Sequence, residues 1–109
     1  TANTNDVQQT IYSELAINNA IPIYYTSHSR AYAALVGISA PNPKTARVLE
    51  LGATYGGNII SQALFNPDAT FVGIELSQEQ VEKGNEVIAK CRANKCSLVQ
   101  SDMHSIGSE

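Results

Sequence analysis

Short apolar runs alternate with amphipathic segments along the second half of the chain. The runs are bounded by turn residues, which is typical of buried strands, and the segments between them have the spacing of helices. The strands are expected at 47–51, 70–75 and 97–101. The helices between them are expected at 58–65 and 77–91. Strands and helices that alternate in this way form a parallel sheet with right-handed crossovers. We therefore expect the first half of a doubly wound parallel α/β sheet, with strand order 3-2-1.

The last predicted helix carries the clearest local signals. Ser77 followed by Gln80 has the spacing of a capping box at a helix start. One helical face would carry Val81, Gly84, Ile88 and Cys91. A glycine on that buried face predicts close packing against a neighbouring element at Gly84.

The first 45 residues have a different pattern. A helix is expected at 6–17, where Val7, Ile11 and Leu15 share one face, followed by an extended loop at 21–26. A second helix is expected at 29–36, with Gly37 as its left-handed C-cap and a turn at 39–43. We therefore expect an N-terminal helical cap and linker at 1–45, and a partial, truncated α/β domain at 46–109.

Composition and charge narrow the functional classes. The chain has 109 residues, with 7 basic and 10 acidic side chains and a net charge of −3. It has no apolar run of the roughly 20 residues that a membrane helix needs, and no secretory signal, so we expect a soluble cytoplasmic protein without a membrane partner. The absence of basic clusters makes nucleic acid an unlikely partner. Cys91 and Cys96 lack the spacing of a zinc or redox motif, so no metal site is predicted and both are expected to be free, buried thiols.

The predicted sheet leaves one strand edge without a neighbour. In a doubly wound sheet the first strand is central, and its other edge pairs with a strand from the second half. That half is absent from this sequence. We expect the edge to be covered by the missing C-terminal half, by self-association with another chain, or by the N-terminal segment.

Candidate chemistry gathers where the three predicted strands end, which is where open α/β sheets bind ligands. The first strand runs into a glycine-bearing loop, 50–58, whose backbone can approach a ligand closely. Glu50 begins this loop, Glu75 ends the second strand 23 residues after Gly52, and Asp102 follows the third. A carboxylate at the second strand end commonly holds the two hydroxyls of a ribose. Three strand-end carboxylates therefore predict a nucleoside pocket.

Three segments at these strand ends resemble motifs I, II and III of class I S-adenosylmethionine-dependent methyltransferases. They are 48–58 (VLELGATYGGN), 71–77 (FVGIELS) and 100–103 (QSDM). The similarity covers about 46–104, and the segment 24–30 also looks like part of one bacterial branch of that family. The resemblance implies a Rossmann-like fold, S-adenosylmethionine as cofactor, and methyl transfer to an unidentified small-molecule or protein acceptor, although this fragment alone is expected to be inactive.

The resemblance also assigns cofactor-binding roles by position. Glu50 and Gly52 would flank the methionine end, Glu75 would bind the ribose and Leu76 would lie against the adenine. Asp102 and Met103 would meet the adenine edge. The loop residues that complete the predicted site are Ala53, Thr54, Gly56 and Asn58. Thr54 departs from the family pattern, which more often has glycine there.

Charge favours this assignment without excluding others. The cofactor carries a sulfonium cation, which suits a carboxylate-lined pocket, whereas Glu50 would repel the phosphates of a dinucleotide. A nicotinamide-binding half of an oxidoreductase and a non-catalytic dimerisation or regulatory module remain alternatives.

Individual site residues also have alternatives. Glu75 could cap the next helix, Asp102 could form a turn, Glu50 could be purely structural and Asn58 could cap its own helix. His28 could be a general base or simply exposed, and Tyr24 and Tyr25 could cover the cofactor or pack in the core. No catalytic residue is assigned.

Overall fold

The computed structural model describes residues 25–105. Three strands, β1 (Arg47–Leu51), β2 (Thr70–Glu75) and β3 (Cys96–Gln100), alternate with α3 (Gly57–Phe65) and α4 (Gln78–Cys91). The helix α2 (Thr26–Leu35) precedes them, and a short 3-10 turn, η2 (Met103–Ser105), follows. The predicted helix at 6–17 lies outside the described residues. None of the helices within 25–105 is long and apolar enough to cross a membrane.

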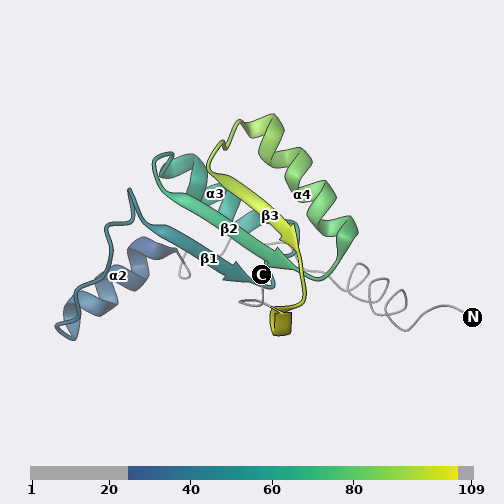
Figure 1. The fold of residues 1–109 in the computed structure, drawn as a ribbon. Coiled ribbons are helices and arrows are strands. Elements are labelled where there is room, and N and C mark those ends of the chain that lie inside the picture. The colour runs from purple at the N-terminus through teal and green to yellow at the C-terminus, as the bar shows by residue number, and fades with distance from the viewer. Residues whose placement is uncertain (1–24, 106–109) are drawn as a thin grey trace, which may run out of the picture.

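The three strands form one parallel sheet in the order β1-β2-β3, which confirms the predicted half of a doubly wound fold (Figure 1). Leu49 of β1 lies beside Val72 of β2, which lies beside Ser97 of β3. All three strands therefore end at one edge of the sheet, and the loops that follow them lie close together there.

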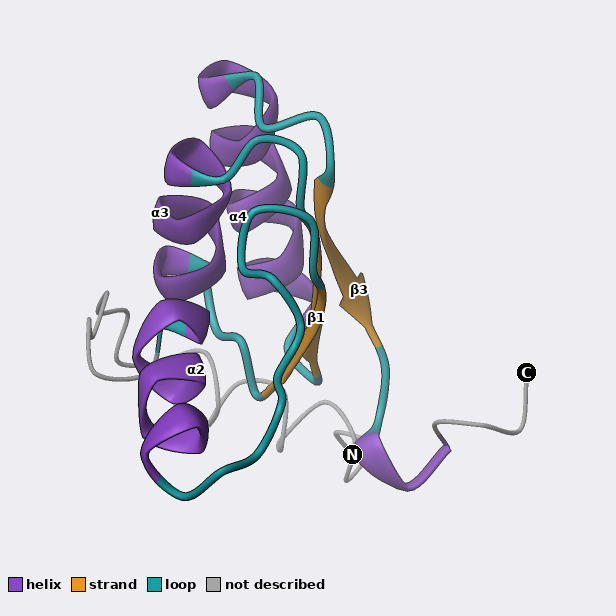
Figure 2. Ribbon diagram, turned by 90° about the vertical axis from the view of Figure 1, so that its left-hand side faces the viewer, coloured by secondary structure: helices purple, strands orange, loops and turns teal. Residues whose placement is uncertain are grey.

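Both crossover helices pack on the same side of the sheet (Figure 2). Phe71 and Leu98 on that side are buried against Ile59 of α3 and Val81 and Ile88 of α4, and they form the centre of the core. The opposite side carries side chains about half exposed, because no described helix covers it. These are Leu49 (55 %), Leu51 (51 %) and Val99 (45 %).

Glycine allows the helices to approach the sheet closely. A Cβ atom at Gly84 would overlap the Leu98 Cδ1 atom and lie 2.6 Å from the Tyr55 carbonyl oxygen, so the predicted close packing is confirmed. On β2, a Cβ atom at Gly73 would lie 2.6 Å from the Ala53 Cβ atom. These two glycines set the separation between the sheet and its helical layer.

The start of α4 follows its predicted cap. Ser77 is the N-cap, and its hydroxyl oxygen accepts a hydrogen bond from the Gln80 backbone amide at 3.4 Å. Cys91, however, was predicted on the buried face and is exposed, whereas Cys96 is buried; both thiols are free. The prediction for Cys91 was wrong: the buried face of α4 ends at Ile88, and the next core residue is Ala93, which follows the helix.

The helix α2 begins three residues before its predicted start, so Thr26 is helical where an extended loop was expected. Its N-cap, Tyr25, provides no side-chain cap. The Gln62 side-chain oxygen of α3 instead accepts from the Thr26 backbone amide at 3.0 Å. This cap comes from 36 residues away, so no local pattern could predict it. At the other end, Gly37 adopts the predicted left-handed conformation with φ +78°.

Candidate functional site

The loop between β1 and α3 turns sharply because three of its residues have positive φ. Gly52 and Gly56 have φ values of 69° and 82°, and Thr54 has a φ of 52°. A residue with a Cβ atom is strained in this region, which accounts for the glycine that the resembling family more often has at Thr54. The loop is tied to the neighbouring strand, since the Gly52 and Ala53 amides donate to the Ile74 carbonyl oxygen at 2.8 and 3.0 Å.

The Glu75 carboxylate, only 6 % exposed, fastens this loop to the start of α4. Its Oε2 atom accepts from the Thr54 backbone amide at 2.9 Å. Its Oε1 atom accepts from the amides of Leu76 at 2.8 Å and Ser77 at 3.2 Å. A carboxylate has about four acceptor sites, so these bonds leave about one on Oε2. Glu75 therefore holds the start of α4, as one alternative proposed, and it also accepts a hydrogen bond from the Thr54 amide of the glycine loop.

Glu50 and Asn58 form a second polar group at the same loop. The Asn58 side-chain amide donates to the Glu50 Oε1 atom at 3.2 Å. The second carboxylate oxygen of Glu50, Oε2, and the side-chain oxygen of Asn58, Oδ1, are buried and have no hydrogen-bond partner among the described residues. Burial raises the pKa of Glu50 above its ordinary value of 4.5, and the Asn58 hydrogen bond opposes this. Two buried acceptors thus have no donor within residues 25–105.

The expectation that Asn58 caps its helix is wrong. The N-cap of α3 is Gly56, which has no side chain with which to cap the helix. Asn58 instead turns its amide toward Glu50 at the end of β1. Asn58 is therefore part of the polar group at the strand end.

The third predicted segment follows β3 at the same edge of the sheet. Asp102 is exposed and its Oδ1 atom accepts from the His104 backbone amide at 2.9 Å, so it also forms the turn considered for it. Met103 is exposed (56 %), and Leu76 is partly buried, with its carbonyl oxygen accepting from the Gln100 side chain at 3.1 Å. The hydrogen bond from the Thr54 backbone amide to Glu75 joins the first two segments, whereas Asp102 and Met103 are placed near them by the sheet topology.

Sequence reasoning missed Ser61 and Gln62, two α3 residues that contact α2. Ser61 lies 2.7 Å from the Tyr25 hydroxyl, and Gln62, 2 % exposed, holds Thr26. Their spacing on α3 carries no motif, so only the tertiary arrangement could identify them. His28 is exposed on α2. Within residues 25–105, no group of three His, Cys, Asp or Glu side chains could hold a metal ion.

Charge is divided between the two ends of the described sheet. Carboxylates gather where the strands end and α4 begins: Glu50, Glu75, Glu79, Glu82 and Asp102. Basic side chains gather at the opposite end, before β1 and between α4 and β3: Lys44, Arg47, Lys90, Arg92 and Lys95. Lys83, which is paired with Glu79, also lies at the carboxylate end, and Asp68 lies at the basic end. Each end still has an excess of one sign, so the end with the glycine loop is negative.

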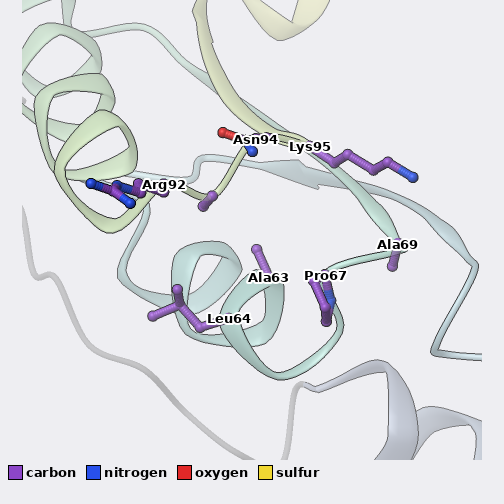
Figure 3. A pocket seen from close by; sticks show the side chains of 8 residues that line it. Ala63, Leu64, Pro67, Ala69, Arg92, Asn94 and Lys95 are labelled. Atoms are coloured by element: carbon purple, nitrogen blue, oxygen red, sulfur yellow. The ribbon is translucent and has the colours of Figure 1, made fainter.

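A small pocket at the basic end lies away from these carboxylates. It is lined by Arg92, Asn94 and Lys95 of the α4–β3 connection together with Ala63 and Pro67 at and after the end of α3 (Figure 3). Its volume is about 130 Å³. Ligand pockets usually occupy about 300 to 1,000 Å³, so this hollow is too small for a nucleoside cofactor.

Structural comparison establishes the fold. PKMT2 from Rickettsia typhi, solved in complex with AdoHcy, superposes with a TM-score of 0.81 at 24% identity, covering 86% of this chain and 18% of that one. A SAM-dependent methyltransferase from Geobacter sulfurreducens, in complex with S-adenosyl-L-homocysteine, gives a TM-score of 0.54 at 21% identity, covering 87% of this chain and 36% of that one.

Sequence comparison identifies relatives that are much longer. The uncharacterized protein RP789 of Rickettsia prowazekii (strain Madrid E) is 42% identical over 59 residues, which is 54% of this chain and 11% of that protein. A second uncharacterized protein of the same strain is 28% identical over 74 residues, covering 68% of this chain and 30% of its own length. The chain thus spans less than a third of either relative.

A family model described as "Putative methyltransferase" matches residues 44–107, which contain the sheet, both crossover helices and the strand-end loops. Because this match extends over more than half of the sequence, the chain belongs to that methyltransferase family.

Proposed function

We propose that this chain supplies the S-adenosylmethionine-binding segment of a methyltransferase that acts on an unidentified acceptor. Membership of the methyltransferase family supports this function. The two solved structures named above contain S-adenosylhomocysteine, which is the product that S-adenosylmethionine leaves after methyl transfer. The cofactor would lie at the carboxyl edge of the sheet, over the glycine loop.

The observation that carries the proposal is the pair of buried acceptors without donors. Glu50 Oε2 and Asn58 Oδ1 both need an N–H or O–H partner, and leaving such groups unpaired costs about 1–3 kcal/mol each. The ammonium group of the cofactor's methionine end has three N–H donors and a positive charge. It would satisfy both oxygens and stabilise the charged form of Glu50, which burial otherwise disfavours.

The other predicted contacts are compatible with this placement. The remaining acceptor site on Glu75 Oε2 would take a ribose hydroxyl, with Leu76 against the adenine. The exposed Asp102 and Met103 would meet the adenine edge. The backbone of the glycine loop would lie beneath the cofactor at Gly52, Ala53, Thr54 and Gly56. These four residues would contact the cofactor through backbone atoms, so no particular side chain is needed there.

The chemistry asked of such a site is mainly positioning. Methyl transfer is an in-line displacement at the methyl group, and holding acceptor and methyl together can supply about 7–11 kcal/mol. Carboxylates near the sulfonium suit its positive charge, whereas Glu50 would repel the phosphates of a dinucleotide. The proposal assigns no catalytic base. Three expectations from the sequence stay predictions: a base role for His28, the cytoplasmic location, and the partner that covers the sheet edge.

Isothermal titration calorimetry with S-adenosylhomocysteine and with NAD tests the proposal. S-adenosylhomocysteine is expected to bind more tightly, and Glu50→Gln is expected to weaken it by about 10- to 150-fold, the equivalent of one charged hydrogen bond. The exposed Glu86→Gln is the matched control and should leave the affinity unchanged. Tighter binding of NAD would favour a dinucleotide site, and binding of neither ligand would favour a non-catalytic module.

A further inference from the structure

A line of hydrogen bonds connects the start of α2 to the first turn of α3. The Tyr25 hydroxyl oxygen lies 2.7 Å from the Ser61 Oγ atom, and the Ser61 hydroxyl donates to the Asn58 carbonyl oxygen at 2.8 Å. A serine hydroxyl has one proton, so a Ser61 that donates to Asn58 must accept from Tyr25. The line therefore has a direction, from the phenol through the serine to the backbone of Asn58.

The same line reaches the carboxylate at the end of β1. The Asn58 side-chain amide donates to Glu50 Oε1 at 3.2 Å, so Tyr25 and Glu50 are linked by three hydrogen bonds and by the covalent bonds between the backbone and side chain of Asn58. A second contact holds α2 in place beside it. The nearly fully buried Gln62 side chain accepts from the backbone amide and the hydroxyl of Thr26, at 3.0 and 3.3 Å.

The first turn of α3 lacks two common restraints from its own sequence. Its N-cap is Gly56, which has no side chain, and its first turn contains no acidic residue. The usual local devices that hold a helix start are side-chain caps and first-turn carboxylates. The Tyr25–Ser61 contact adds a restraint from outside the helix at the turn that carries Asn58, in addition to the burial of Ile59 and Ile60 in the core.

We propose that Tyr25 is a positioning residue for the amino-acid end of the cofactor. Its hydroxyl, through Ser61, fixes the first turn of α3 and thereby sets where the Asn58 amide and the Glu50 carboxylate point. This inference rests on the proposed function, because it concerns the same two acceptors. It adds that the segment before the α/β domain takes part in forming the cofactor site without contacting the cofactor.

The test compares two ligands that differ at one end. S-adenosylhomocysteine has the amino-acid group, and 5′-methylthioadenosine lacks it. Tyr25→Phe removes only the hydroxyl and is expected to weaken S-adenosylhomocysteine about three- to tenfold, while the affinity for 5′-methylthioadenosine stays unchanged. Tyr32→Phe, at an exposed tyrosine of the same helix, is the matched control and should change neither affinity. An equal loss for both ligands would indicate general loosening of the fold and overturn the proposal.

A double-mutant cycle examines the intermediate residue. Ser61→Ala should weaken S-adenosylhomocysteine by a similar factor, and adding Tyr25→Phe to it should cause no further loss, because the line is already broken. Additive losses would overturn the assignment of Ser61 as the link.

A ligand-free measurement separates this inference from the proposed function. Tyr25→Phe is expected to shift the NMR signals of the Asn58 side-chain amide, whereas Tyr32→Phe is not. If the protein binds no S-adenosylhomocysteine but this shift occurs, the cofactor assignment fails and the positioning of Asn58 stands. If Glu50→Gln weakens binding but Tyr25→Phe changes neither the affinity nor the amide signals, the proposed function stands and the role of Tyr25 is refuted.

Discussion

Replacing Glu75 with glutamine should show how far the glycine loop depends on one carboxylate. In Glu75→Gln the side-chain oxygen can still accept from Leu76 and Ser77, but an NH₂ group replaces the oxygen that accepts from the Thr54 amide. Two donors then face each other in a site only 6 % exposed. One hydrogen bond to a charged group is worth about 1.5–3 kcal/mol, and the two remaining bonds lose their charge assistance.

We therefore expect Glu75→Gln to lower the free energy of unfolding by about 2–4 kcal/mol, a large part of the 5–15 kcal/mol typical of a domain. Urea denaturation without ligand measures this value, with the exposed Glu86→Gln expected within about 0.5 kcal/mol of the unmodified protein. If Glu75→Gln also fell within that margin, the carboxylate would not hold the loop, and the interpretation of its three bonds would be refuted.

Four further predictions concern the close packing, the loop strain and the two titrating groups. Gly84→Ala should lower the free energy of unfolding in urea by about 1–3 kcal/mol despite its better helix propensity, and an unchanged midpoint would contradict the close packing. Thr54→Gly should raise the urea midpoint, because it relieves about 1–2 kcal/mol of strain from the left-handed backbone conformation, more than the roughly 0.4–1 kcal/mol lost to the greater entropy of the unfolded chain. Thr54→Ala, which keeps the Cβ atom and therefore the strain, is the control and should not raise the midpoint. Burial, with a smaller contribution from the Glu50 charge, raises the pKa of the Cys96 thiol to about 11. Iodoacetamide at about pH 9 should therefore alkylate the exposed Cys91 in the folded protein, and Cys96 only after unfolding. Mass spectrometry of the two samples measures this difference. Burial raises the pKa of Glu50 in the folded state, so the folded protein binds the proton of this carboxyl group more tightly than the unfolded chain does. The free energy of unfolding should therefore fall as the pH rises from 4.5 through the pKa of the folded state. Urea titrations of Glu50→Gln should lack this pH-dependent fall.

The sequence predicts the sheet well because its signals are local. β1 and β2 have the predicted bounds, since short apolar runs between turn residues leave little freedom in where a strand starts. The cap of α4 was also predictable, because Ser77 and Gln80 are three residues apart. The start of α2 was not, because its cap is Gln62 on another helix.

The candidate site was predictable in position but not in its contacts. Strand-end carboxylates could be located from the strands alone, and topology brings them to one edge. The sequence could not show that the Glu75 carboxylate accepts hydrogen bonds from three backbone amides, or that the Asn58 side chain donates to Glu50. These contacts depend on how the glycine loop folds back on β2, which is a property of the packed structure.

The division of charge along the sheet distinguishes the proposed cofactor from its product. S-adenosylmethionine carries a net positive charge, which disappears when the sulfonium becomes a thioether on methyl transfer. A negative strand-end edge opposite a basic end creates a field that steers an incoming cation, over a range of about 10 Å at moderate ionic strength. The product, S-adenosylhomocysteine, has no net charge, so this long-range attraction acts on it far less. The long-range attraction that hastens the arrival of the cation therefore adds little to the retention of the product, which would depend on short-range contacts with Glu50 and Glu75.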